Sequence, residues 1–168
     1  MSSFGRRGRG AALCALLAAS RGFGAPVPPG GWATNGPPLF QVSAVAADPA
    51  QDSSVYCASS IIEAKQSAIF HSADGGNTWD PLVELLTGEF YSTLLVDARQ
   101  PQRIYAGARG TDNHGKIYRS IDGGAHWIQT ASVPPPSCSP SFAAGSGAQT
   151  VLAACGSTLL RSPDGGAT

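Results

Sequence analysis

The acidic side chains that could catalyse a reaction are few and show no paired spacing. Hydrolysis of a glycosidic bond uses two carboxylic acids that face each other across a cleft. After the acids that belong to turn motifs are set aside, Glu63, Asp80, Glu84 and Glu89 remain. Their spacing favours no pair, so we interpret them as solvated surface carboxylates. The sequence predicts no catalytic residue.

The arginines and histidines likewise form no recognisable site. Several converging arginines would be needed to clamp a substrate carboxylate. Arg119 and Arg161 each stand just before a Ser in a repeated segment, so we interpret them as features of a repeat. His114 lies near Asp112 and Asn113, where a cation could bind, but polar loop residues are the preferred interpretation. Solvation explains the arginines in or beside turns and loops, which are Arg99, Arg103 and Arg109. His71 is the strand residue equivalent to Arg119, and His126 replaces a Thr.

No metal or cofactor is expected. The cysteines match no zinc-ligand spacing. The chain also has no nucleophile elbow, phosphate-binding loop or dinucleotide fingerprint.

One segment type recurs three times, at Ser72–Trp79, Ser120–Trp127 and Ser162–Thr168. Each holds Ser-x-Asp-Gly-Gly, and the three aspartates are 48 and 42 residues apart. Glycine accepts positive φ at no steric cost, so Asp-Gly-Gly favours a tight turn between two strands. We expect the carboxylate to accept backbone N–H groups of its own turn, the hydroxyls to bridge the flanking strands, and the Trp to pack between sheets. The structural residues of these turns are Ser72, Asp74, Gly76, Thr78, Trp79, Ser120, Asp122, Gly124, Trp127, Ser162, Asp164 and Gly166.

The segments that position these turns also repeat. Asp48 and Tyr56 recur 49 residues later as Asp97 and Tyr105. Each unit predicts four short strands, a pattern typical of a propeller blade. The predicted strands are 42–47, 55–59, 68–71 and 78–80, then 93–97, 104–108, 116–119 and 126–130. A Leu/Val cluster between Pro81 and Thr87 allows one turn of helix.

The repeated segment resembles the Asp-box, or bacterial neuraminidase repeat. Ser72–Trp79 matches all eight positions, the second copy has His126 in place of Thr, and the third stops before its Trp. The resemblance covers residues 40–168. It implies a β-propeller in which the Asp-box joins the outer two strands of a blade, away from the central pocket, with a structural role. Sialidases, xyloglucan-cleaving glycoside hydrolases, sortilin-type receptors and a photosystem assembly factor carry such repeats.

The expected fold is therefore all-β: a propeller fragment of about two and a half to three four-stranded antiparallel blades. The blade units are predicted at about 40–88, 89–132 and 139–168. Since propellers close with about four to eight blades, missing blades or other copies of the chain would be needed to close the ring.

The N-terminus reads as an export signal over residues 1–25, with Arg6, Arg7 and Arg9 ahead of an apolar stretch and small residues near Ala25. The nine-residue apolar stretch is too short for a stable membrane span. A Pro/Gly-rich linker is predicted at 26–39. The expected location is therefore secreted or periplasmic.

Three cysteines follow the predicted signal. In an oxidising compartment Cys138 and Cys155 could form a disulfide. The alternative is that both, with Cys57, are buried free thiols.

The composition of the chain restricts the kinds of molecule that it is expected to bind. Charged residues make up 13%, and eleven Lys and Arg balance eleven Asp and Glu. A neutral chain without a basic stripe has no electrostatic attraction to nucleic acid. Propellers bind through loops, so Ser60–Ser67 and Arg109–Gly115 are the expected contact surfaces. Phe90 and Tyr91, at an interblade connection, are the next candidates, and packing in the core or at the rim is their preferred interpretation.

These observations favour an exported, non-catalytic scaffold or binding module for a protein or glycan. Two alternatives stay open. One is a fragment of a sialidase-like or xyloglucanase-like glycoside hydrolase whose catalytic residues lie in further blades. The other is an assembly or stability factor for a membrane complex.

Overall fold

The computed structural model describes residues 36–37, 41–61, 66–82, 86–87, 89–134, 138–145 and 149–167. Within these ranges the chain forms three antiparallel sheets and no helix. This confirms the all-β prediction. The expected export signal and nearly all of the expected linker lie outside the described residues, so both stay predictions.

The first sheet, here the first blade, comprises β1 (Gln41–Ala47), β2 (Val55–Ile61), β3 (Gln66–Ser72) and β4 (Asp80–Pro81), paired in that order. A further short strand, β5 (Leu86–Thr87), pairs with the beginning of β3. The helical turn allowed by the Leu/Val cluster is therefore wrong at Leu86–Thr87, because those residues extend the edge of the sheet. Residues 83–85 lie outside the described part.

The second blade comprises β6 (Glu89–Val96), β7 (Ile104–Gly110), β8 (Gly115–Ser120) and β9 (Ile128–Val133). The third comprises β10 (Ser141–Ala144), β11 (Val151–Cys155) and β12 (Thr158–Ser162). We had expected the fourth strands to begin before the Trp, but β4 and β9 begin after it. The reason is that the amides of Thr78 and His126 donate to the turn carboxylates and not to a strand.

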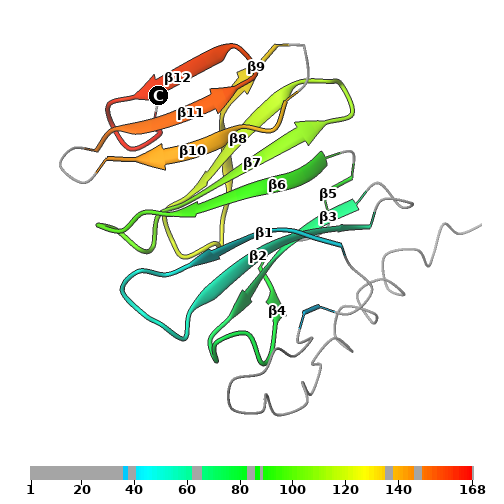
Figure 1. Ribbon diagram of the computed structural model, residues 1–168, viewed down its shortest axis with the longest axis vertical. Helices are drawn as coiled ribbons and strands as arrows, with labels where there is room; N and C mark the ends of the chain where they lie inside the picture. The colour runs from blue at the N-terminus through cyan, green and yellow to red at the C-terminus, as the bar shows by residue number, and fades with distance from the viewer. Residues whose placement is uncertain are drawn as a thin grey trace, which may run out of the picture.

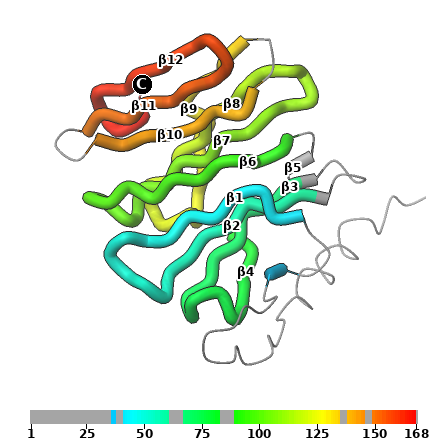
Figure 2. Tube along the Cα trace, in the orientation of Figure 1, coloured from blue at the N-terminus to red at the C-terminus, as the bar shows by residue number. Residues whose placement is uncertain are grey.

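The three blades follow one another in chain order, face against face (Figure 1). The tube view shows the same succession, from the first blade in cyan and green to the third in orange and red (Figure 2). The first strands of the blades lie side by side, since β6 contacts β1 and β10 contacts β6. Side chains link these strands: the Ser43 hydroxyl donates to the Tyr91 carbonyl at 2.6 Å, and the Thr93 hydroxyl donates to the Pro140 carbonyl.

The largest core cluster lies between the first two blades. Ala58 and Ile69 of the first blade pack against Tyr91, Ala106 and Tyr118 of the second, and Ala58, Ile69 and Ala106 are fully buried. Period-two alternation along each strand supplies one apolar face to each neighbouring blade. Burial between sheets therefore holds successive blades in their order.

The turn between the first two strands repeats in detail in the first two blades. The Asp48 carboxylate accepts the Ala50 amide at 2.8 Å, and the Asp97 carboxylate accepts the Arg99 amide at 3.0 Å. The matching backbone bonds also recur at a spacing of 49 residues. The sequence repeat is thus a repeat of hydrogen bonds.

Among the residues that the structure describes, there is no helix with the length and apolar character needed to cross a membrane.

Candidate functional site

The first Asp-Gly-Gly turn is closed by its own carboxylate. Oδ1 of Asp74 accepts the Ser72 hydroxyl and the Thr78 amide, both at 2.8 Å, and Oδ2 accepts the Thr78 hydroxyl at 2.6 Å. The Ser72 hydroxyl oxygen in turn accepts the Gly76 amide at 2.8 Å. Gly75 and Gly76 have φ of 71° and 92°, where a side chain would be strained. One carboxylate therefore braces the whole hairpin.

The second and third turns reuse this arrangement. The Asp122 carboxylate accepts Ser120, the His126 amide and the His126 ring, at 2.8, 2.9 and 2.6 Å. The imidazole thus takes the place of the Thr78 hydroxyl. In the third turn Asp164 accepts Ser162 at 2.6 Å and the Ala167 amide at 3.0 Å. Each carboxylate bonds inside its own turn, so the three do not converge on one site.

The bonds also set the acidity of the turn carboxyls. Hydrogen bonds from the Thr78 hydroxyl and amide, followed by Ser72, lower the pKa of Asp74 to about 2. The His126 amide and ring, followed by Ser120, lower the pKa of Asp122 to about 2. An acid with so low a pKa stays ionised at neutral pH and cannot act as a general acid there. These groups are consequently suited to a structural role.

Each turn is anchored to the neighbouring turn of its blade. The Gly75 amide donates to the Ser53 carbonyl at 2.8 Å, and the Gly123 amide donates to the Gln102 carbonyl at 2.9 Å. The third blade repeats the bond with Gly165. The Asp-Gly-Gly turns and the turns between the first two strands therefore share one end of the sheets, here called the turn end.

The tryptophans that follow the first two Asp-Gly-Gly turns fold back over those turns. The Trp79 indole N–H donates to the Gly76 carbonyl at 3.1 Å, and the Trp127 indole N–H donates to the Gly124 carbonyl at 2.8 Å. Trp79 packs on Cys57 of its own blade, whereas Trp127 packs in the core between the first two blades. The expectation that the Trp of each turn packs between sheets therefore holds for Trp127.

Two interpretations of the charged residues need correction. Glu89 is a partly buried group rather than a solvated one, since its carboxylate accepts Lys116 Nζ at 2.8 Å and the Tyr118 hydroxyl at 2.7 Å. Arg103 is not explained by solvation, because its guanidinium lies 3.4 Å from the buried Asp97 carboxylate. Both are structural ion pairs within the second blade. The first pair joins residues on different strands, which sequence spacing does not show, whereas Asp97 and Arg103 lie within one turn.

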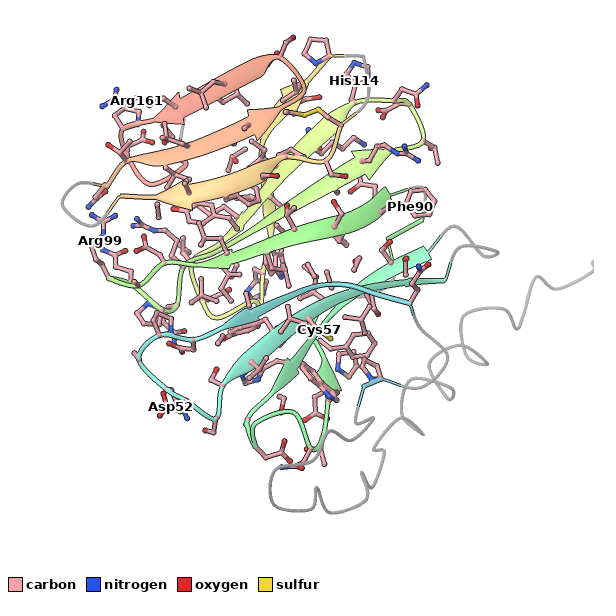
Figure 3. All side chains as sticks on the ribbon, in the orientation of Figure 1. Asp52, Cys57, Phe90, Arg99, His114 and Arg161 are labelled. Carbon is pink, nitrogen blue, oxygen red and sulfur yellow. A yellow bond between two sulfur atoms is a disulfide. The ribbon has the colours of Figure 1, made fainter. Side chains whose placement is uncertain are left out.

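The strand ends opposite the turn end surround a groove. A cavity of 500 Å³ lies where the first strands of three successive blades begin, and it is lined by Gln41, Val42, Ser43, Ser60, Phe90, Tyr91, Ser92, Arg109, Cys138 and Ser139. The strand register explains why these residues lie close together, because Gln41 pairs with Ser60 and Phe90 pairs with Arg109. In Figure 3, Phe90 and His114 lie on one side of the molecule, and Asp52 and Arg99 lie on the other.

The groove combines one positive charge with apolar and hydroxyl groups. Arg109 is exposed and no ion pair joins it to an acid of the described residues. Phe90 is half-buried and Ser60 adds a hydroxyl, whereas the Ser43 hydroxyl already donates to the Tyr91 carbonyl and Ser92 Oγ is buried. The described lining contributes no carboxylate. The groove can therefore bind an anionic or polar ligand that also has an apolar part, and the residues described in its lining supply no acid/base pair.

Part of this groove was predicted from the sequence. Arg109 begins one of the expected contact loops and Ser60 begins the other, although residues 62–65 lie outside the described part. Phe90 and Tyr91 belong to β6 and not to an interblade connection as expected, and Tyr91 is buried. Gln41, Ser43 and Ser92 were missed, because only the alignment of β1 with β6 brings them together. Among the described residues, no group of three metal-binding side chains occurs.

A disulfide fixes one wall of the groove. Cys138 and Cys155 are joined, with their Cα atoms 5.4 Å apart and a separation of 17 in the sequence. Cys57 is a free, buried thiol, and burial raises its pKa to about 12. The disulfide also sits against the second blade, since a Cβ at Gly115 would lie 2.7 Å from Cys155 Sγ. It therefore holds Cys138 and Ser139 at the edge of the groove.

Comparison with known proteins shows the fold. The chain matches no family model and no curated protein. Solved structures with a similar fold include the Niastella koreensis GH74 enzyme, with a TM-score of 0.60 and 21% identity over 76% of this chain and 22% of that one. The GH74 xyloglucanase from Xanthomonas campestris gives 0.59 and 22%, over 77% and 23%. YCF48 bound to D1 peptide gives 0.57 and 16%, over 79% and 40%.

These similar structures are β-propeller proteins, and at identities below 25% the likeness concerns the fold alone. The chain spans between 22% and 40% of their lengths. Three successive antiparallel sheets with adjacent first strands agree with that architecture. The described chain therefore has the fold of β-propeller blades.

Proposed function

We propose that this chain is an exported, non-catalytic Asp-box propeller segment that binds an extended peptide of a partner protein in the groove. The observation that carries the proposal is the groove itself, which the first strands of three blades form at the end opposite the braced turns. The turns make each blade rigid, and a rigid scaffold positions binding groups at its free ends.

The chemistry of the groove suits a peptide with an acidic group. Arg109 can bond a carboxylate in bidentate fashion, Phe90 offers an aromatic surface, and the Ser60 hydroxyl can bond a peptide group. One structure of similar fold, YCF48, is described as bound to D1 peptide. Export is supported by the disulfide between Cys138 and Cys155, since disulfides persist in oxidising compartments.

Selection from a random twelve-residue phage-displayed peptide library tests the proposal. Selected peptides are expected to be enriched in Asp or Glu. Arg109→Ala should weaken their binding by roughly tenfold or more, the worth of a charge-assisted hydrogen bond. Arg161→Ala is the matched control, because Arg161 is also exposed but lies outside the groove. Equal binding to Arg109→Ala and the wild type would refute the proposal.

The GH74 structures favour a second candidate, in which the groove belongs to a xyloglucan-binding surface of a glycoside hydrolase. Titration with xyloglucan oligosaccharides, with an assay for new reducing ends, separates the two. Oligosaccharide binding that Phe90→Ser abolishes, together with no selected acidic peptides, would favour this candidate.

A further inference from the structure

The disulfide between Cys138 and Cys155 faces the groove with one of its cysteines. Cys138 is half-buried and lines the groove, whereas Cys155 is only 3% exposed. A thiol that enters the groove can therefore reach Cys138 and not Cys155. Buried structural cysteines are inert, whereas reactive cysteines occupy surroundings that are partly exposed and positively charged. Cys138 meets the first of these conditions.

Arg109 supplies the positive charge. It pairs with Gly115 across β7 and β8, and paired residues of neighbouring strands project on the same face of a sheet. A Cβ at Gly115 would lie 2.7 Å from Cys155 Sγ and 3.3 Å from Cys138 Sγ. Both sulfur atoms therefore lie over Gly115, on the face from which the Arg109 side chain projects. Because Arg109 and Cys138 also line the same groove, the guanidinium and the disulfide are neighbours.

The fold of a blade does not require this arrangement. In the first blade Ser60 pairs with Ser67 at the strand positions that Arg109 and Gly115 occupy in the second, counted from the Ser of each Asp-Gly-Gly turn. The first blade thus forms the same strand pair with hydroxyl side chains and without a cation. The second blade adds a positive charge and, at the glycine, the space that the disulfide occupies.

The charge of Arg109 is available to a ligand or to a sulfur atom. No ion pair joins it to an acid of the described residues, and the acids at the same end of the blade, Glu89 and Asp112, face Lys116 at 2.8 and 3.6 Å. A nearby positive charge stabilises a thiolate relative to a thiol. Arg109 therefore favours the thiolates that form when the disulfide is reduced, and this makes reduction easier.

We propose that the Cys138–Cys155 disulfide is a redox-active site that exchanges with a small thiol carrying carboxylate groups. A carboxylate of the thiol bonds the Arg109 guanidinium, and the sulfur of the thiol attacks Cys138 from the groove. The reaction uses the geometry of the groove but no bound peptide. Failure to select acidic peptides would overturn the proposed function and leave this inference to its own test.

The exchange consumes two thiols in two steps. The thiolate of the first thiol attacks Cys138 Sγ and forms a mixed disulfide there. The electron pair of the broken S–S bond leaves on Cys155 Sγ, which takes up a proton from water. A second thiolate then attacks the sulfur of the first thiol and releases Cys138 as a thiolate beside Arg109. The chain gains two electrons, and the two thiols are oxidised to their own disulfide.

Glutathione and 2-mercaptoethanol test the site on the oxidised, folded chain. Glutathione carries carboxylates, whereas 2-mercaptoethanol is a neutral thiol. Peptide mapping by mass spectrometry after an acid quench gives the rate and the position of mixed-disulfide formation. We expect the glutathione adduct at Cys138. An adduct at Cys155, or no adduct in the folded chain, would overturn the proposal.

Substitution of Arg109 tests the role of its charge. Arg109→Ala should slow exchange with glutathione by roughly tenfold, the effect of losing a charge-assisted hydrogen bond, and should slow exchange with 2-mercaptoethanol by a smaller factor. Arg109→Lys keeps the charge and should retain most of the rate. Arg161→Ala is the matched control, because Arg161 is an exposed strand arginine outside the groove. Equal glutathione rates in Arg109→Ala and the wild type would contradict the proposal.

The redox equilibrium separates a chemical role of Arg109 from a structural one. Titration with a glutathione redox buffer at pH ~8, close to the ordinary pKa of a thiol, gives the point of half reduction. Loss of the cation removes stabilisation from the reduced chain alone, so Arg109→Ala should need a buffer that is more reducing by roughly threefold or more. If Arg109 only held the groove in shape, its loss would loosen the disulfide. Easier reduction of Arg109→Ala would therefore overturn the inference.

Cys57 reports whether the chain stays folded during the exchange. It is a buried free thiol of the first blade, and burial raises its pKa to about 12, so it should react with iodoacetamide only when the chain opens. A short pulse of iodoacetamide during reduction by glutathione should modify Cys138 while Cys57 stays protected. Modification of Cys57 at the rate of disulfide loss would show that exchange follows unfolding, as for an ordinary structural disulfide, and would refute a redox-active site in the groove.

Discussion

Replacement of Trp127 by Ala should destabilise the contact between the first two blades. Its indole packs against the buried cluster between the blades, which includes Ala106 and Tyr118, and donates to the Gly124 carbonyl at 2.8 Å. Truncation of a core Trp or Phe to Ala costs about 3–5 kcal/mol. Because Trp127 is partly exposed, we expect a loss at the lower end, about 3 kcal/mol. That is a large fraction of a typical stability of roughly 5–15 kcal/mol.

Urea unfolding at neutral pH, with the disulfide intact, measures this loss. The midpoint should fall with little change in slope. Trp127→Phe is the matched control, because it keeps most of the apolar ring and loses the indole hydrogen bond, which costs about 1 kcal/mol. Addition of indole to Trp127→Ala should restore part of the stability. A loss below about 1 kcal/mol in the Ala variant, on the scale of a surface substitution, would refute the assignment of Trp127 to the core.

Three further predictions concern the turns and the disulfide. First, the pKa of Asp74 and of Asp122 is about 2 in the folded chain, below the ordinary value near 4. The stability that these ionised carboxylates contribute should therefore be present above about pH 4 and be lost as the pH falls towards 2. Asp74→Asn should flatten the acid limb of a pH–stability curve. Second, Gly124→Ala should destabilise more than Gly75→Ala in thermal unfolding. Both positions have positive φ, but only a Cβ at Gly124 would come within 2.6 Å of Leu82 Cδ1. Third, Cys138→Ser with Cys155→Ser should lower the free energy of unfolding by about 3 kcal/mol, the loop-closure value for a loop of this length. An unchanged unfolding midpoint in the double variant would contradict it.

The turns could be predicted because their interactions are local. Ser72, Asp74 and Thr78 bond one another within seven residues of sequence, so spacing alone identifies them. The strands followed from short apolar runs between turn residues, and the repeat predicted successive blades. The disulfide stayed open because cysteine spacing does not determine pairing.

The groove and the buried charges could not be predicted in this way. Ser43 and Ser92 meet only because β1 and β6 align across two blades. Glu89 looked like a surface acid, yet Lys116 and Tyr118 reach it from β8. These contacts depend on how the sheets pack against one another, and the spacing of residues along the sequence does not show that packing. The sites where ligands bind are consequently the least visible from sequence.

Chemical-shift mapping with a selected acidic peptide tests the central claim that the turn end braces the blades and the opposite end binds. The largest amide shifts are expected at Gln41–Ser43, Phe90–Ser92 and Arg109, with the Asp-Gly-Gly turns unchanged. Shifts concentrated at Asp74–Thr78 and Asp122–His126, with the groove silent, would contradict it.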